Sequence, residues 1–173
     1  MNDKKKTDLI KQINEFEERY EYDCTYMREL LASSPEGYEK FYSAIALAEH
    51  RDLLDPTTYW VARLAAMKSE DCGECLQLNV RMALEAGIDK AVVAQTVQGG
   101  QDLQAELRDV YWFAQGVATN SLNDDALVDR IESRFNKGQL LEFGLCISMA
   151  KFFPTTRRAA GYTKSCRSVE IVV

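Results

Sequence analysis

The residues with the clearest chemical potential are two cysteines in the segment Glu70-Asp71-Cys72-Gly73-Glu74-Cys75. Side chains three positions apart on a helix lie on one face, so the Cys72 and Cys75 thiols are close enough to form a disulfide with little backbone movement. Dithiol redox chemistry requires this proximity. The preceding polar turn predicts a nearby helix N-terminus, which favours a thiolate. The three neighbouring carboxylates oppose that effect, because negative charge disfavours a further anion.

Two other readings of this cysteine pair remain open. A zinc site would need two further ligands, and the candidates are dispersed along the chain, with no second C-x-x-C: Cys24, His50, Cys146 and Cys166. The pair is also compatible with inert core residues, because cysteine packs as a small apolar side chain. The spacing and its polar context favour a redox dithiol, with no metal and no bound cofactor.

The elements that must position the pair are helices. Hydrophobic residues recur at helical spacing nearly everywhere, which predicts an all-α fold: a single-domain bundle of about eight helices with an N-terminal helical arm. The arm is expected over residues 1–34 and the helical domain over residues 35–173. Asp55 as N-cap and Pro56 at the first helical position predict a helix that ends near Lys68. Ser69-Glu70-Asp71 is expected to cap the helix that carries the cysteines, which stops at Gly87.

The rest of the chain continues the helical pattern. Further helices are expected over residues 89–97, 102–118, 124–135 and 139–153, the last of them broken by Pro154, with a final helical turn over residues 156–160. Only residues 169–173 look strand-like, and five residues do not make a sheet. Cys146 falls in an apolar run and is expected in the core, whereas Cys24 and Cys166 read as incidental thiols.

Composition narrows the classes of partner. The chain has 173 residues, with 27 acidic and 21 basic side chains and a net charge of −6, which disfavours nucleic acid and anionic membranes. An odd count of five cysteines does not suit a disulfide scaffold. No stretch approaches the roughly 18 apolar residues of a membrane span, and the polar start does not look like a signal peptide. These observations predict a cytoplasmic protein.

The cysteine segment and its flanks resemble a known family. Leu54-Asp55-Pro56-Thr57, the Trp60–Ala66 helix, Cys72-Gly73-Glu74-Cys75-Leu76-Gln77-Leu78-Asn79 and Ala83-Leu84-Glu85-Ala86-Gly87 look like the core of the carboxymuconolactone decarboxylase and alkylhydroperoxidase D (AhpD-like) superfamily. The resemblance covers about residues 37–100 and extends more weakly over residues 139–166. The N-terminal arm lies outside it.

The resemblance implies an all-helical homo-oligomer, often a trimer or hexamer. The branch with paired cysteines reduces disulfides or hydroperoxides with an external dithiol electron donor, as an antioxidant oxidoreductase or peroxidase with a redox-active disulfide. In that branch the second cysteine attacks and the first resolves. Carried over, Cys75 attacks and Cys72 resolves, although helix-terminus electrostatics alone would favour Cys72 as the nucleophile.

The chain departs from the family pattern at the proton relay. Trp60 and Asn79 stand where the family has a glutamate and a histidine, and Glu74 replaces a histidine that some members carry. Neither an indole nor an amide exchanges a proton near neutral pH. Glu74, the nearest carboxylate, and His50, at a predicted helix end, are the candidate substitutes, together with Glu70.

These departures keep two other functions open. Loss of the relay at Trp60 and Asn79 favours a non-catalytic oligomeric helical scaffold or binding protein that retains the family fold. A carboxymuconolactone-decarboxylase-type activity on a small organic acid or lactone is less favoured, because Asn79 removes the histidine that such chemistry would use.

Overall fold

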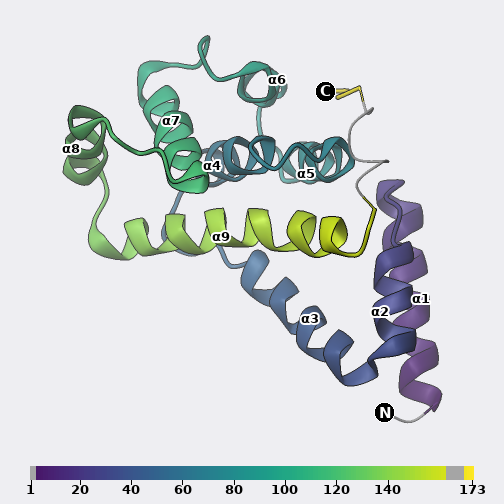
Figure 1. The fold of residues 1–173 in the computed structure, drawn as a ribbon. Helices are drawn as coiled ribbons and strands as arrows, with labels where there is room; N and C mark the ends of the chain where they lie inside the picture. Colours follow the sequence, from purple (N-terminus) through teal and green to yellow (C-terminus); the bar gives the residue numbers. More distant parts are fainter. Residues whose placement is uncertain (1–2, 163–169) are drawn as a thin grey trace.

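The chain folds as helices packed around one buried central helix (Figure 1). The computed structural model describes residues 3–162 and 170–173. Within that part there are nine α-helices and no strand, which confirms the all-α prediction; residues 170–173 are irregular. The helices are α1 (Asp3–Tyr20), α2 (Thr25–Ser33), α3 (Pro35–Ala48), α4 (Pro56–Lys68), α5 (Gly73–Glu85), α6 (Lys90–Gln98), α7 (Ala105–Thr119), α8 (Asp125–Arg134) and α9 (Lys137–Ala159).

Helix α4 is the centre of the bundle. Every residue from Thr58 to Met67 is buried, and the helix packs against α5, α6, α7 and α9. A helix that is apolar nearly all round belongs in a core. Its start is as predicted, because the Asp55 carboxylate accepts a hydrogen bond from the Thr58 amide at 3.0 Å and Pro56 occupies the first helical position.

Helix α9 runs along the length of the molecule beside α4 (Figure 1). Asn136 and Gln139 form a capping box at its start. The predicted break at Pro154 is wrong, because the helix continues unbroken to Ala159. A proline inside a helix removes one backbone hydrogen bond and costs about 3 kcal/mol. Here Pro154 is buried in the body of the protein, and its packing offsets part of that cost.

The N-terminal arm is formed by α1 and α2, which stand side by side at one end of the bundle (Figure 1). The end of α1 and the residue after it contact the helix that carries the cysteines. Glu85, at the end of α5, pairs with Arg19 and accepts a hydrogen bond from the Tyr20 hydroxyl at 2.7 Å. Arg81, on the same helix, donates to the Tyr20 carbonyl and pairs with Glu21. The arm therefore packs on the cysteine helix of its own chain.

A buried carboxylate fixes the connection between α3 and α4. Glu142 of α9 is 2% exposed and accepts hydrogen bonds from three successive backbone amides, those of Asp52 at 3.1 Å, Leu53 at 2.7 Å and Leu54 at 3.3 Å. Because a carboxylate has about four acceptor positions, one side chain satisfies this whole turn. The turn's neighbouring residues reach the cavity described below.

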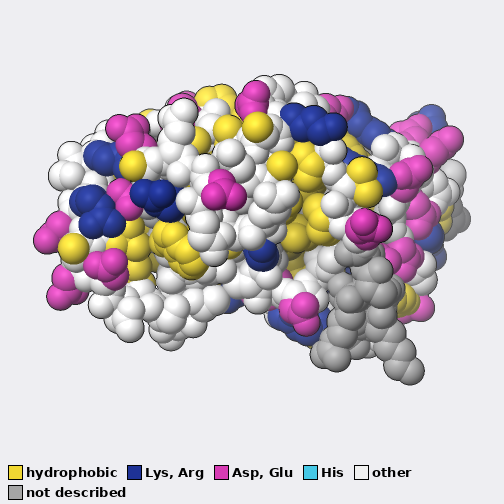
Figure 2. Space-filling view, turned by 90° about the horizontal axis from the view of Figure 1, so that it is seen from above, with side chains coloured by type: hydrophobic (Ala, Val, Ile, Leu, Met, Phe, Trp, Pro, Cys, Tyr) yellow, Lys and Arg dark blue, Asp and Glu magenta, His cyan; other side chains and the backbone are white. Residues whose placement is uncertain are grey.

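The surface mixes charges of both signs. On the face seen in Figure 2, Lys and Arg side chains are interspersed with Asp and Glu, and hydrophobic side chains gather in patches between them. None of the described helices is both long enough and apolar enough to span a membrane.

Candidate functional site

The two cysteines lie at the N-terminal end of α5. Cys72 is the N-cap residue, with extended backbone (φ −116°, ψ 91°), and Cys75 lies in the first helical turn. The prediction that Ser69-Glu70-Asp71 caps this helix is wrong. Asp71 instead adopts a left-handed conformation (φ 50°), which turns the chain so that Cys72 takes the cap position. Both cysteines are buried.

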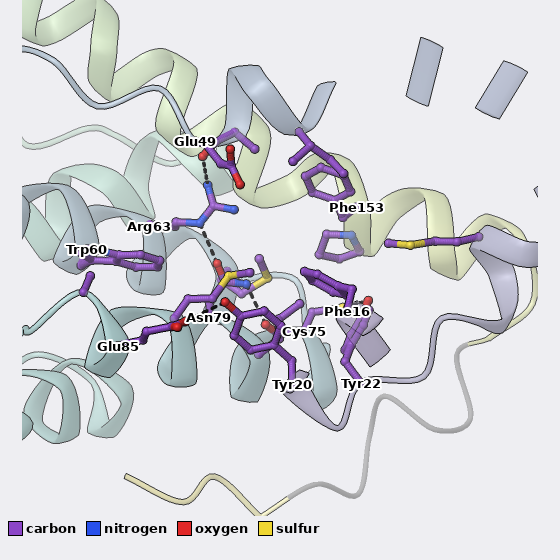
Figure 3. A pocket seen from close by; sticks show the side chains of 18 of the residues that line it. Phe16, Tyr20, Tyr22, Glu49, Trp60, Arg63, Cys75, Asn79, Glu85 and Phe153 are labelled. Atoms are coloured by element: carbon purple, nitrogen blue, oxygen red, sulfur yellow. Dashed lines mark hydrogen bonds between the residues drawn. The ribbon is translucent and has the colours of Figure 1, made fainter. Parts of the chain in front are cut away.

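Cys75 lines a cavity of about 290 Å³ between the arm and the bundle (Figure 3). Cys72 is not among the lining residues of the described chain. The walls come from α1, α2, α3, α4, α5 and α9 and are predominantly aromatic and aliphatic, with a few charged groups. The lining residues are Phe16, Tyr20, Tyr22, Tyr26, Met27, Ile45, Ala48, Glu49, Arg51, Trp60, Arg63, Met67, Cys75, Leu78, Asn79, Met82, Glu85, Ala86, Phe153 and Pro154.

Trp60 and Asn79, the residues in place of the family's relay, both face this cavity. Asn79 is held between two neighbours: its amide Nδ2 donates to the Cys75 carbonyl at 2.8 Å, and its Oδ1 accepts from Arg63 Nε at 2.6 Å. The Arg63 guanidinium also lies 5.9 Å from the Trp60 ring centroid. At Asn79, one of these two positions, the side-chain amide is therefore hydrogen-bonded to an arginine. Neither group exchanges a proton near neutral pH.

The Tyr22 side chain contacts the sulfur of Cys75. The Tyr22 hydroxyl lies 3.5 Å from Cys75 Sγ, in a buried position. Burial raises the pKa of Tyr22 well above its ordinary value of 10.0, and the nearby Tyr26 and Cys75 act in the same direction. Tyr22 therefore stays a neutral hydroxyl that can donate a hydrogen bond to a thiolate and cannot act as a base.

Arg157 of α9 lies behind Tyr22 and is fully buried. Its guanidinium lies 5.0 Å from the Tyr22 ring centroid and forms ion pairs with Asp23, at 3.3 Å, and with Glu74. The proximity of Tyr22, Glu74 and Cys75 raises the pKa of Arg157, against the effect of burial. The guanidinium thus supplies a permanent positive charge close to the cysteine end of α5.

The candidate substitute bases lie elsewhere. Glu74 pairs with Arg157 and is not a lining residue, so the structure does not bring its carboxylate into the cavity. Glu70 is buried in ion pairs with Arg158, at 2.7 Å, and Lys151, at 3.4 Å. His50 is exposed in the connection after α3 and is not a lining residue either. Of the predicted site residues, the structure places only Cys75 on the cavity wall.

Sequence reasoning did not select Arg63 or the aromatic residues of the arm. Arg63 is 6% exposed and is the one charged residue between Tyr59 and Met67. A single charged residue in the middle of an apolar helix is visible in the sequence and could have indicated Arg63 as a site residue. The arm residues had no comparable signal, because Phe16, Tyr20 and Tyr22 read as the apolar stripe of an amphipathic helix and its end.

Cys146 is buried in the core as predicted, 3.7 Å from the Tyr59 carbonyl that its thiol contacts. Cys24 is fully buried, and Cys166 lies outside the described residues. Among the described residues, no group of three or more His, Cys, Asp or Glu side chains could hold a metal ion. Comparison of the chain with protein-family models, curated protein sequences and solved structures finds no match.

Proposed function

We propose that the protein is an AhpD-like thiol-disulfide redox protein in which Cys72 and Cys75 cycle between dithiol and disulfide. The observation that supports this most directly is the different placement of the two cysteines. Cys75 lines a ligand-sized cavity, and Cys72 is placed at the cap of the same helix, outside the cavity. This matches the roles implied by the family resemblance, in which Cys75 attacks and Cys72 resolves.

The proposed reaction reduces a substrate disulfide in two exchange steps. The Cys75 thiolate attacks one sulfur of the substrate, a protein–substrate S–S bond forms, the substrate S–S bond breaks, and one half leaves as a thiolate. The Cys72 thiolate then attacks Cys75 Sγ and releases the second half. The substrate gains two electrons, and the protein retains a Cys72–Cys75 disulfide. An external dithiol donor reduces that disulfide and restores the starting state.

The cavity suits disulfides better than hydroperoxides as substrates. Cleavage of an O–O bond by a thiolate expels an alkoxide, which requires a proton during the reaction. Arg63 and Asn79 do not supply one near neutral pH, and the raised pKa of Tyr22 makes its hydroxyl a poor acid. A leaving thiolate needs no such proton. We therefore propose disulfide reduction as the main activity and hydroperoxide reduction as a slower one.

The experiment that tests the redox pair is differential alkylation with mass spectrometry. After mild oxidation with diamide, Cys72 and Cys75 should resist alkylation and appear as one disulfide-linked peptide, which a dithiol reductant separates. The matched control is Cys146→Ala, which removes a buried thiol away from the cavity and should leave this behaviour unchanged. If Cys72 and Cys75 both remain separately alkylatable after diamide treatment, the redox proposal fails.

The second candidate is a non-catalytic binding protein, favoured by one specific observation. Asn79, one of the two relay positions, is hydrogen-bonded to Arg63, and both side chains line a largely apolar cavity, an arrangement suited to holding a ligand. Consumption of a small disulfide with a dithiol donor separates the two functions. A rate for Cys75→Ser equal to that of the wild type would favour the binding protein. Both proposed functions are compatible with the homo-oligomer that the resemblance implies. Light scattering measures the oligomeric state.

A further inference from the structure

Arg63 is a buried cation that the described protein does not neutralise. Its Nε donates to Asn79 Oδ1 at 2.6 Å, and its Nη1 donates to the Ala48 carbonyl and to the Tyr59 hydroxyl, both at 3.2 Å. All three acceptors are uncharged. None of the ion pairs among the described residues includes Arg63.

A buried charge is costly unless an opposite charge accompanies it. Arginine cannot relieve that cost by losing its proton, because the guanidinium stays charged at all physiological pH values. The three hydrogen bonds orient Arg63 without cancelling its charge. In Figure 3 its guanidinium projects from the wall of the cavity, with the Asn79 bond on one side and the Nη1 bond on the other. Those bonds use Nε and Nη1, which leaves Nη2 for a ligand.

The four charged lining groups are two arginines and two glutamates, and of these only Arg63 is buried. Glu85 accepts a hydrogen bond from the Tyr20 hydroxyl and pairs with Arg19, and both contacts lower the pKa of its carboxyl. The Arg51 guanidinium lies 5.4 Å from the Trp60 ring centroid, and this arginine is exposed. Glu49 is the remaining acidic lining residue, and it is exposed.

We propose that the cavity binds an amphipathic carboxylate, whose carboxyl group pairs with Arg63 and whose apolar body packs on the aromatic and methionine walls. Planar guanidinium groups match carboxylate geometry, and charge-assisted hydrogen bonds are stronger in a desolvated site. The cavity volume of about 290 Å³ suits a small aromatic or medium-chain acid. If this ligand is also the substrate, the proposal rests on the proposed function. The disulfide that Cys75 attacks then carries a carboxylate group.

The test is isothermal titration calorimetry of the full-length, reduced protein with two matched probes, phenylbutanoate and its neutral amide, phenylbutanamide. The acid should bind at least ~10-fold more tightly than the amide, because it gains a charge-assisted bond to Arg63. Arg63→Met should abolish that preference. Glu49→Gln should tighten binding of the acid several-fold, because it removes the competing carboxylate. Arg130→Met, which changes an exposed arginine paired with Asp109 outside the cavity, should leave both affinities unchanged.

Several outcomes would overturn the carboxylate site. Equal affinities for the acid and the amide, or no saturable binding of either probe, contradict it. If circular dichroism shows that Arg63→Met does not fold, two other measurements test the carboxylate site. They are the difference in affinity between the acid and the amide in the wild type, and whether Glu49→Gln tightens or weakens binding of the acid. The probes contain neither S–S nor O–O bonds, so their binding is independent of redox activity. Failure of the dithiol experiment and failure of this one are therefore distinguishable.

Discussion

Replacement of Glu142 tests whether one buried carboxylate holds the turn between α3 and α4, which adjoins the cavity. The side chain accepts three backbone hydrogen bonds, at 2.7 to 3.3 Å, and is 2% exposed. A hydrogen bond to a charged group contributes roughly 1.5–3 kcal/mol. In Glu142→Ala the amides of Asp52 and Leu53, on exposed residues, recover water, whereas that of Leu54 is buried. Counting one bond in full and two at about half gives a loss of ~3–6 kcal/mol.

Glu142→Gln should lose less, about 2 kcal/mol, because one oxygen acceptor remains while the charge is lost and an NH₂ group faces backbone donors. Glu132→Gln, at an exposed position on α8, is the matched control and should change stability by less than about 0.5 kcal/mol. The measurement is urea unfolding followed by the helical circular dichroism signal, with the midpoint shifted and the slope unchanged. A Glu142→Ala protein within about 1 kcal/mol of the wild type would refute this reasoning.

Three further predictions follow from the site and the core. Tyr22→Phe removes the hydroxyl 3.5 Å from Cys75 Sγ and should slow iodoacetamide alkylation of Cys75 about 5-fold at neutral pH, which corresponds to ~1 kcal/mol; an unchanged rate contradicts this. Burial raises the pKa of the Cys24 and Cys146 thiols from 9.0 to about 12, so the unfolded chain ionises first as pH rises. Stability that is complete below pH 9 should therefore fall by ~1.4 kcal/mol per cysteine at pH 10, and Cys146→Ala should reduce the decline in urea unfolding experiments. Pro154→Ala restores a helical amide in α9 at the expense of a buried ring and should raise the unfolding free energy by ~1 kcal/mol; a less stable protein would show that ring packing dominates.

The helices could be predicted where local chemistry determines them. Asp55 and Pro56 specify the start of α4 by side-chain capping and by a fixed φ angle, and the structure confirms both. The two errors have tertiary or conformational causes. Pro154 stays inside α9 because its ring is buried, and a local rule contains no information on burial. Asp71 takes a left-handed conformation, which Asp tolerates better than most residues, and so moves the cap to Cys72.

The site could be predicted only in part, for a different reason. The spacing of Cys75 from Cys72 is local information, and it predicts Cys75 as a site residue. The connection of Arg63 to Asn79 joins residues on two helices, and its importance depends on burial, which a single charged position does not reveal. His50 and Glu74 were reasonable by residue type alone. The fold places the former on the surface and pairs the latter with Arg157, a partner 83 positions further along the chain.

The N-terminal arm forms a large part of the cavity wall and therefore bears directly on ligand specificity. It lies outside the family resemblance, yet α1, α2 and their connection contribute five of the cavity residues: Phe16, Tyr20, Tyr22, Tyr26 and Met27. Amphipathic spacing predicts that one face of such helices is buried, but it does not identify the surface they bury against. Since Tyr22 also contacts Cys75, the arm shapes both the ligand space and the surroundings of the proposed nucleophile. A chain with the same cysteine helix and a different arm would therefore retain the dithiol and accept a different ligand.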